Sequence, residues 1–216
     1  MIGNLNLNDH KGKGLYAVAR TSSEAEFENE RSKLKSNNLA NFANPVENVM
    51  KMGISNGMII ADMGAGSGHY TLALASVLGN TGRVYAIDVQ KDLLARIKNE
   101  ADKKAFTNVD IVWADIEKPG GTKMRDDVVD VVLISNTLFQ IEEKQVTLLE
   151  AKRIIKPNGR LILIDWSESF GGLGPISTNV LTKEKAIDLV SSSGFEFEKE
   201  FDAGAHHYGL IFRNKK

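Results

Sequence analysis

Three glycines at alternate positions, Gly64, Gly66 and Gly68, follow the mostly apolar run Met58–Met63. That run is typical of a buried strand, and the segment His69–Leu78 after the glycines is typical of a helix. Glycine has no Cβ, so the backbone of such a turn can approach a ligand closely. A helix N-terminus adds unpaired N–H groups and a partial positive charge. The order strand, glycine turn, helix therefore predicts a cradle for a small polar or anionic group.

Acidic residues occupy the positions where two of the expected strands end. Asp62 lies two residues before Gly64, and Asp88 ends the β-rich run Gly82–Asp88, 20 residues after Gly68. An acid in the position of Asp88 can accept hydrogen bonds from the ribose hydroxyls of any adenosine ligand. Dinucleotide-binding turns follow the pattern G-x-G-x-x-G, whereas this turn follows G-x-G-x-G. The spacing favours a different adenosine cofactor without excluding a nicotinamide.

The segment Ala61–Gly68 resembles the first motif of the class I S-adenosylmethionine-dependent methyltransferases. In that family the glycine turn holds the methionine end of the cofactor. The expected strand Asn108–Ile116 ends in another acid, Asp115, which the resemblance implies accepts from the adenine amino group while Ile116 donates its N–H. Asn136 occupies the fourth-motif position of the family, and Lys152–Asp165 matches the helix, turn and strand that follow.

The resemblance implies S-adenosyl-L-methionine as the cofactor and ten cofactor-binding residues. They are Asp62, Gly64, Ala65, Gly66, Gly68, Asp88, Val89, Asp115, Ile116 and Asn136. For Asp62 two roles stay open, because its carboxylate can accept from the turn backbone or from a water on the cofactor. For Asp88 and Asp115 the structural alternative is that each carboxylate caps the turn that follows its strand.

The hydrophobic pattern predicts alternating strands and helices along most of the chain. Strands are expected near 58–63, 83–88, 109–115, 128–135 and 160–165, and helices near 45–53, 69–79, 91–105, 142–156 and 182–193. Val46, Val49 and Met50 are expected to share one face of the first helix. Several strands are almost continuously apolar, as in parallel sheets that are covered on both faces. Two further strands, 195–201 and 206–213, are joined by a short turn and form an antiparallel hairpin.

The fold class predicted from the pattern and the resemblance is α/β. It is a Rossmann-like, doubly wound, seven-stranded sheet, mainly parallel with a C-terminal antiparallel hairpin and with helices on both faces. Residues 1–40 are expected to be an N-terminal extension with a lid helix at Thr21–Asn41, and residues 41–216 to be the cofactor-binding domain. A glycine-rich stretch, Ser167–Leu181, has the length of a functional loop over the site.

The composition narrows the classes of function. The chain has 216 residues, a formal net charge of −1 and no cysteine. These values predict no global attraction to nucleic acid or to an anionic membrane, and they exclude disulfides and thiolate catalysis. No apolar run is long enough to span a membrane, and the first residues lack a signal-peptide core. We expect a cytoplasmic protein without a metal site.

The catalytic residues are harder to predict than the cofactor site. Methyl transfer from a sulfonium is an in-line displacement that depends mainly on alignment and exclusion of water, so it requires a base only when the acceptor loses a proton. The amine-methylating signature of the family is absent, because Ser135–Phe139 reads Ser-Asn-Thr-Leu-Phe. His206, His207 and Asp165 are candidate bases. Strand alternation places His206 and His207 on opposite sides, which favours a structural role for the histidines.

The leading hypothesis is therefore a methyltransferase that acts on a small-molecule acceptor. Residues 40–213 resemble members near the ubiquinone and menaquinone C-methyltransferases. Three alternatives remain: a cofactor-binding regulatory module without turnover, a nicotinamide-dependent oxidoreductase, and an RNA methyltransferase. The sequence does not specify the acceptor, the acceptor atom or the oligomeric state.

Overall fold

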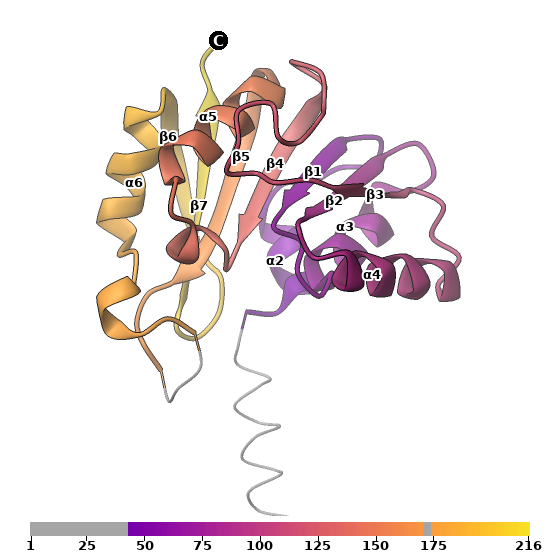
Figure 1. Cartoon of the computed structure of the whole chain (residues 1–216), viewed down its shortest axis with the longest axis horizontal. Helices are drawn as coiled ribbons and strands as arrows, with labels where there is room; N and C mark the ends of the chain where they lie inside the picture. The colour runs from indigo at the N-terminus through magenta and orange to yellow at the C-terminus, as the bar shows by residue number, and fades with distance from the viewer. Residues whose placement is uncertain (1–42, 171–173) are drawn as a thin grey trace, which may run out of the picture. The chain divides into compact units, whose positions relative to one another are not determined.

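Seven strands form one sheet in the computed structural model, which describes residues 43–170 and 174–216. The strands are β1 (Ile59–Met63), β2 (Arg83–Asp88), β3 (Val109–Trp113), β4 (Val129–Ser135), β5 (Ile155–Trp166), β6 (Phe195–Asp202) and β7 (His207–Asn214). Their order across the sheet is β3-β2-β1-β4-β5-β7-β6 (Figure 1). The first five run parallel to one another, and β7 runs antiparallel to both of its neighbours. The predicted fold class is confirmed.

Helices cover both faces of this sheet. They are α2 (Pro45–Lys51), α3 (His69–Leu78), α4 (Lys91–Lys103), α5 (Lys144–Ile154) and α6 (Lys183–Ser192), with short 3-10 turns η1 (Leu138–Gln140) and η2 (Ser177–Asn179). Apolar side chains of α2, α3 and α4 pack in one core layer, and those of α5 and α6 pack in the other. Strand alternation feeds both layers: Val131 and Leu133 belong to the first, and Val132 and Ile134 to the second.

The switch in connection direction between β1 and its two neighbours positions the site. From β1 the chain continues outward to β2 and β3, and then returns to place β4 on the other side of β1. The carboxyl ends of these parallel strands meet at one edge of the sheet, and the loops that leave them diverge. Ligands of open α/β sheets bind in the crevice at such a point.

Two local predictions about the elements are wrong. Val46 and Met50 do not share a buried face with Val49, because they are 57% and 78% exposed while Val49 is fully buried. The helix is too short for its apolar spacing to fix one face, and the buried polar residue Asn48 takes a core position instead. The strand expected at 160–165 begins five residues earlier, at Ile155.

The early start of β5 has a visible cause in the strand pairing. Ile155 pairs with Val129 and Arg160 with Val131, so the register shifts between these two pairs and the intervening residues bulge. Asn158, in that bulge, has a left-handed backbone with φ of 61°. The letters Lys-Pro-Asn-Gly are typical of a turn, and the sequence alone does not reveal that this turn is embedded in a strand.

The predicted division of the chain at residue 40 stays a prediction. The predicted lid helix at Thr21–Asn41 and residues 171–173 of the glycine-rich loop lie outside the described residues.

Candidate functional site

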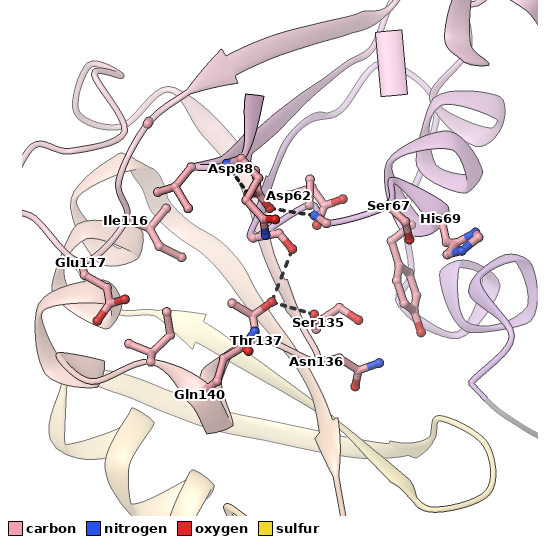
Figure 2. A pocket seen from close by; sticks show the side chains of 18 of the residues that line it. Asp62, Ser67, His69, Asp88, Ile116, Glu117, Ser135, Asn136, Thr137 and Gln140 are labelled. Carbon is pink, nitrogen blue, oxygen red and sulfur yellow. Dashed lines mark hydrogen bonds between the residues drawn. The ribbon is translucent and has the colours of Figure 1, made fainter. Parts of the chain in front are cut away.

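A cavity of about 530 Å³ lies at the carboxyl ends of β1 to β4 (Figure 2). Its volume falls within the range of small-molecule sites, roughly 300–1,000 Å³. Every predicted cofactor residue except Gly68 lines it. The sequence therefore predicted residues from four separate loops that the fold brings to one cavity.

The glycine turn forms one wall through left-handed backbone. The φ angles of Gly64, Gly66 and Gly68 are 80°, 53° and 81°, which residues with a Cβ rarely adopt. The amides of Gly64 and Ala65 both donate to the carbonyl of Ile87, at 2.9 and 3.0 Å, which fixes the turn against β2.

The outer glycines of the turn are also required by close packing. A Cβ on Gly64 would lie 2.6 Å from Cγ2 of Thr137, and one on Gly68 would lie 2.5 Å from Cγ1 of Ile97. Gly68 does not line the cavity, because it is the N-cap of α3 and packs against α4. The absence of a Cβ at Gly68 allows helix α3 to start in close contact with α4. That start has no side-chain cap, so the first amides of α3 face the turn unpaired by a side chain.

Asp88 holds the turn and the following loop at the same time. Its Oδ2 accepts from the amide of Gly66 at 2.9 Å, and its Oδ1 accepts from the amide of Gln90 at 2.8 Å. Asp88 therefore caps the turn that follows β2, which is the structural alternative for this acid. Each carboxylate oxygen has a second lone pair, so the same side chain can still accept from two ribose hydroxyls.

Asp62 is buried behind the turn, and its carboxylate does not receive the turn amide that was one of its two predicted partners. Its Oδ2 accepts from the hydroxyl of Thr71 on α3 at 2.6 Å, and the turn amide goes to Asp88 instead. Burial raises the pKa of Asp62 to about 6, the Thr71 hydrogen bond lowers it in part, and the nearby charge of Asp88 raises it further. Two carboxylates so close together favour a cation between or beside them.

Asp115 and Ile116 lie on the loop after β3 and line the opposite wall. Asp115 accepts from the amide of Glu117 at 3.0 Å and pairs with Lys118 at 3.0 Å. The Lys118 hydrogen bond is the largest cause that lowers the pKa of this carboxyl, so it is ionised near neutral pH. Ile116 is buried and offers an apolar surface beside it.

Asn136 ends β4 in a strained conformation. Its φ is 51°, its amide N–H donates to the carbonyl of Ile164 at 2.8 Å, and its Oδ1 is buried without a hydrogen-bond partner in the described part of the chain. Backbone strain and unsatisfied polar atoms are concentrated at ligand sites. Figure 2 shows Asn136 next to Ser135 in the lining of the cavity.

Several residues that line the cavity were not predicted as cofactor residues. They are Tyr70, Ser135, Thr137, Gln140, Ile141 and Glu117, together with Ala43 and Pro45 before and in α2. The hydroxyl of Tyr70 accepts from the side chain of buried Asn48 at 2.8 Å, and Asn48 also donates to the carbonyl of Ala203 at 2.9 Å. A helical tyrosine and a helical asparagine carry no local signal for this role, because the contact arises only after α2, α3 and the β6–β7 turn have packed together.

The wall from Thr137 to Ile141 is fastened by side chains from other strand ends. The hydroxyl of Thr137 donates to the carbonyl of Ser135 at 2.9 Å and lies 3.3 Å from the carbonyl of Gly64 on the glycine turn. The amide of Phe139 donates to Oδ2 of Asp165 at 3.0 Å. Glu117 binds the two amides just beyond this wall. The position of Gln140 and Ile141 is thus set by residues of β1, β3 and β5 loops.

The three candidate bases do not line the cavity. Asp165 is fully buried with both oxygens accepting backbone amides, and burial raises its pKa to about 7. His207 is buried beside Trp166, and burial lowers the pKa of its imidazole.

His206 does not follow the strand alternation expected of it. It precedes β7 with a φ of 64°, stacks on Phe170 and lies 2.7 Å from Oε1 of Glu168. Its orientation is therefore set by the turn. The catalytic role of all three residues stays a prediction.

The chemistry of the lining fits S-adenosyl-L-methionine. Left-handed glycines allow close backbone approach, Asp88 has free lone pairs for a ribose, and buried Asp62 lines the cavity as a carboxylate that can neutralise a cation. In residues 43–170 and 174–216 no cluster of three His, Asp or Glu side chains is arranged to hold a metal ion. In the same residues no helix is both long and apolar enough to cross a bilayer.

Curated proteins are similar to part of this chain in sequence. The chain is 33% identical over 122 residues to the demethylmenaquinone methyltransferase of Staphylococcus aureus, which covers 56% of this chain and 48% of that protein. It is 32% identical over 117 residues to a ubiquinone/menaquinone biosynthesis C-methyltransferase of Ectopseudomonas mendocina, covering 54% and 44%. The chain thus spans about half the length of these curated relatives.

A solved structure agrees over a larger part of the fold. The crystal structure of a SAM-dependent methyltransferase from Aquifex aeolicus superimposes with a TM-score of 0.74 at 25% identity, covering 85% of this chain and 97% of that one. Residues 54–203, which contain β1 to β6 and nearly all of the cavity, match the family described as "Methyltransferase domain". The chain belongs to this family of S-adenosylmethionine-dependent methyltransferases.

Proposed function

We propose that this chain binds S-adenosyl-L-methionine in the cavity and catalyses transfer of its methyl group to a small-molecule acceptor. The observation that carries the proposal is the joint placement of the glycine turn, Asp88 and Asp115 around one cavity of about 530 Å³. When bound, the sulfonium cofactor supplies an already activated methyl group. The chain then contributes alignment and exclusion of water.

Each part of the lining has an assigned task in this proposal. Asp88 accepts from the ribose hydroxyls, and the loop of Asp115 and Ile116 binds the adenine ring by a hydrogen bond and an apolar face. The glycine turn and the start of α3 surround the methionine end, where Asp62 offers negative charge. Asn136 and Tyr70 then lie at the end of the cavity from which an acceptor would approach.

The names of the relatives make a reduced quinone ring the first acceptor to test. One relative is named as a ubiquinone/menaquinone biosynthesis C-methyltransferase and the other as a demethylmenaquinone methyltransferase. Methylation at a ring carbon requires loss of a proton, so a base is needed in that case. Of the predicted bases, His206, whose imidazole lies 2.7 Å from Oε1 of Glu168 and outside the cavity lining, is the first to replace. A cytoplasmic location and the absence of nucleic-acid partners remain predictions of this proposal.

Thermal unfolding with S-adenosylhomocysteine, S-adenosylmethionine and NADH tests the cofactor. Saturation at 100 times the dissociation constant stabilises by about 2.7 kcal/mol, which raises the midpoint by roughly 5–10 °C. The sulfur cofactors should produce this shift and NADH should not. Asp88→Ala should abolish it, while Asp110→Ala, which loses only an exposed ion pair with Arg83, should retain it.

The alternatives predict different outcomes. A shift with NADH alone would contradict the methyltransferase proposal. Binding of the sulfur cofactors without methyl consumption over a panel of quinols, phenols and amines would favour the regulatory module. Methylation of RNA with strong dependence on salt would favour the RNA methyltransferase.

A further inference from the structure

Glu117 connects two walls of the cavity that belong to different parts of the sheet. It directly follows Asp115 and Ile116 on the loop after β3. Its Oε2 accepts from the amide of Glu142 at 3.0 Å and from the amide of Glu143 at 3.1 Å. Both amides lie just before α5, in the segment that follows β4 and η1. One carboxylate oxygen therefore bridges the loop of β3 and the segment that follows η1.

The bridge acts as a cap for α5 that is supplied from outside the helix. Glu143 is the N-cap of α5 and makes no side-chain capping hydrogen bond of its own. Helix N-termini carry unpaired amides and a partial positive charge, so an external carboxylate stabilises this start. Hydrogen bonds to a charged group are stronger than neutral ones. The bridge therefore stabilises the start of α5 from outside the helix.

The other end of the bridge is equally well held. The amide of Glu117 donates to Asp115 at 3.0 Å, and Asp115 pairs with Lys118 at 3.0 Å. These bonds link Asp115, Glu117 and Lys118 within the loop, and Glu117 joins the loop to the segment before α5. Figure 2 shows Ile116, Glu117 and Gln140 together at one side of the cavity, away from Ser67 and His69.

We propose that Glu117 is a positioning residue for the adenine end of the cofactor. It holds Asp115 and Ile116 at the separation from the Thr137–Ile141 wall that a flat ring requires. It acts through the loop rather than by contact with the ring. This inference rests on the proposed function. It extends that function, because the affinity for the adenine half of the cofactor would depend on the carboxylate of Glu117 at the start of α5, outside the glycine turn and the acids at the strand ends.

Two ligands separate the adenine end from the methionine end. Dissociation constants for adenosine and for S-adenosylhomocysteine are measured by calorimetry on the full chain. Glu117→Ala should raise both constants by the same factor, about tenfold, because the loop must then be ordered during binding. Glu117→Gln keeps an oxygen in place without the charge, so it should raise both by about threefold. Glu198→Gln, which removes a carboxylate from an ion pair with Arg213 on β6 and β7, should change neither.

A second pair of variants tests the bridge from its other end. Glu143→Pro removes one of the two bridging N–H groups and leaves Glu117 intact, and proline is well tolerated at helix starts. Glu143→Ala loses the same side chain but keeps the N–H. We expect weaker binding of both ligands, by about threefold, in Glu143→Pro and unchanged binding in Glu143→Ala.

The outcomes separate positioning from other roles. A lower unfolding midpoint with unchanged constants in Glu117→Ala would make its role merely structural and overturn the proposal. Weaker binding of S-adenosylhomocysteine alone would place Glu117 at the methionine end, and an effect of Glu117→Ala without one of Glu143→Pro would indicate direct contact with the ring. Either result overturns it. If the unaltered chain bound neither ligand, the proposed function itself would fail.

Discussion

The cluster around Glu150 and the cavity around Asp62 each bury a carboxylate, in opposite surroundings, and the buried carboxylate of Asp165 belongs to neither. Glu150 on α5 lies in a cluster outside the cavity, where it accepts from Gly120, from the amide and hydroxyl of Thr122, and from Arg153. Burial alone would raise its pKa, but the hydrogen bonds from Arg153 and Thr122 lower it to about 2. In the cavity, Asp62 accepts from the hydroxyl of Thr71 but has no cation beside it in the described residues, and burial raises its pKa to about 6.

The contrast distinguishes a carboxylate that stabilises the fold from one that is held ready for a ligand. The Glu150 cluster supplies a complete set of donors, including a cation, so the charge is stabilised by the protein itself. Asp62 is buried next to Asp88 with no cation beside it in the described residues. Strained backbone at Asn136 marks the same cavity. A cationic ligand in the cavity would supply the favourable electrostatic energy that the buried charge of Asp62 lacks.

The largest expected effect is on the cluster. Glu150→Ala leaves several buried donors and part of Arg153 unpaired, so it should lower the free energy of unfolding by about 3 kcal/mol. The midpoint of thermal unfolding at pH 7 should fall by roughly 6–12 °C. Gln145→Ala, an exposed position on the same helix, is the control and should change little. A loss of under about 1 kcal/mol would remove the contrast between the two regions.

The pH dependence of this effect follows from the lowered pKa. The stabilisation by Glu150 is fully present above its unfolded pKa of 4.5 and is lost as the pH falls toward its folded pKa of about 2. The difference in free energy of unfolding between Glu150→Ala and the unaltered chain should therefore shrink as the pH is lowered from about 5 to about 3. Chemical denaturation at these two pH values measures it.

The next effect concerns the turn. Gly64→Ala places a Cβ at a φ of 80° and 2.6 Å from Thr137, so we expect a loss of about 2 kcal/mol and no measurable cofactor binding. Gly120→Ala is the matched control, because Gly120 has a φ of 69° but nothing within 4 Å of the added Cβ. It should cost only the backbone strain, about 1 kcal/mol. Equal losses in chemical denaturation would show that the contact with Thr137 is unimportant.

A change of opposite sign is expected at Asp62. Asp62→Asn removes a buried charge and keeps an oxygen for Thr71, so the ligand-free chain should gain about 1–2 kcal/mol at pH 8. The folded pKa is about 6 and the unfolded pKa is 3.8, so the gain is complete above about pH 6 and disappears below 3.8. Binding of S-adenosylmethionine should weaken at the same time. A destabilised variant at pH 8 would contradict the view that this carboxylate is held for a ligand.

The smallest effect sets the baseline for both regions. Glu198→Gln removes a half-exposed ion pair with Arg213 at 2.8 Å, and we expect a change of about 0.5 kcal/mol or less. Unfolding in low and high salt measures it, since such pairs are screened by salt. A larger change would mean that surface charges, and not only the buried carboxylates, determine stability.

Much of the fold could be predicted because its signals are local. The apolar strands, the glycine turn and the acids at the ends of β2 and β3 are each encoded in a few neighbouring residues, and β2 was predicted with its exact bounds, Arg83–Asp88. The family resemblance supplied the order of the motifs. Tyr70, Gln140 and Glu117 were not predicted as part of the site, because their contacts join elements distant in sequence.

The errors have the same origin. Nothing local distinguishes Val46 and Met50 from core residues, and their exposure depends on how α2 lies against α3 and the β6–β7 turn. The bulge before Arg160 depends on pairing with β4. For Asp62 and Asp88, the sequence placed both acids at the turn, and only the structure shows which of them receives the turn amide.

The place of β7 in the sheet has a consequence for how the chain is made. β7 lies between β5 and β6, and β6 pairs with no other strand of the described chain. During synthesis, β5 therefore waits with an open edge, and β6 has no neighbour, until residues 207–214 have left the ribosome. Open edges of half-formed sheets recruit other chains. Expression at lower temperature, or with a chaperone that binds unfolded chains, should thus raise the yield of folded protein. The gain should exceed that from stabilising substitutions in β1, β2 or β3.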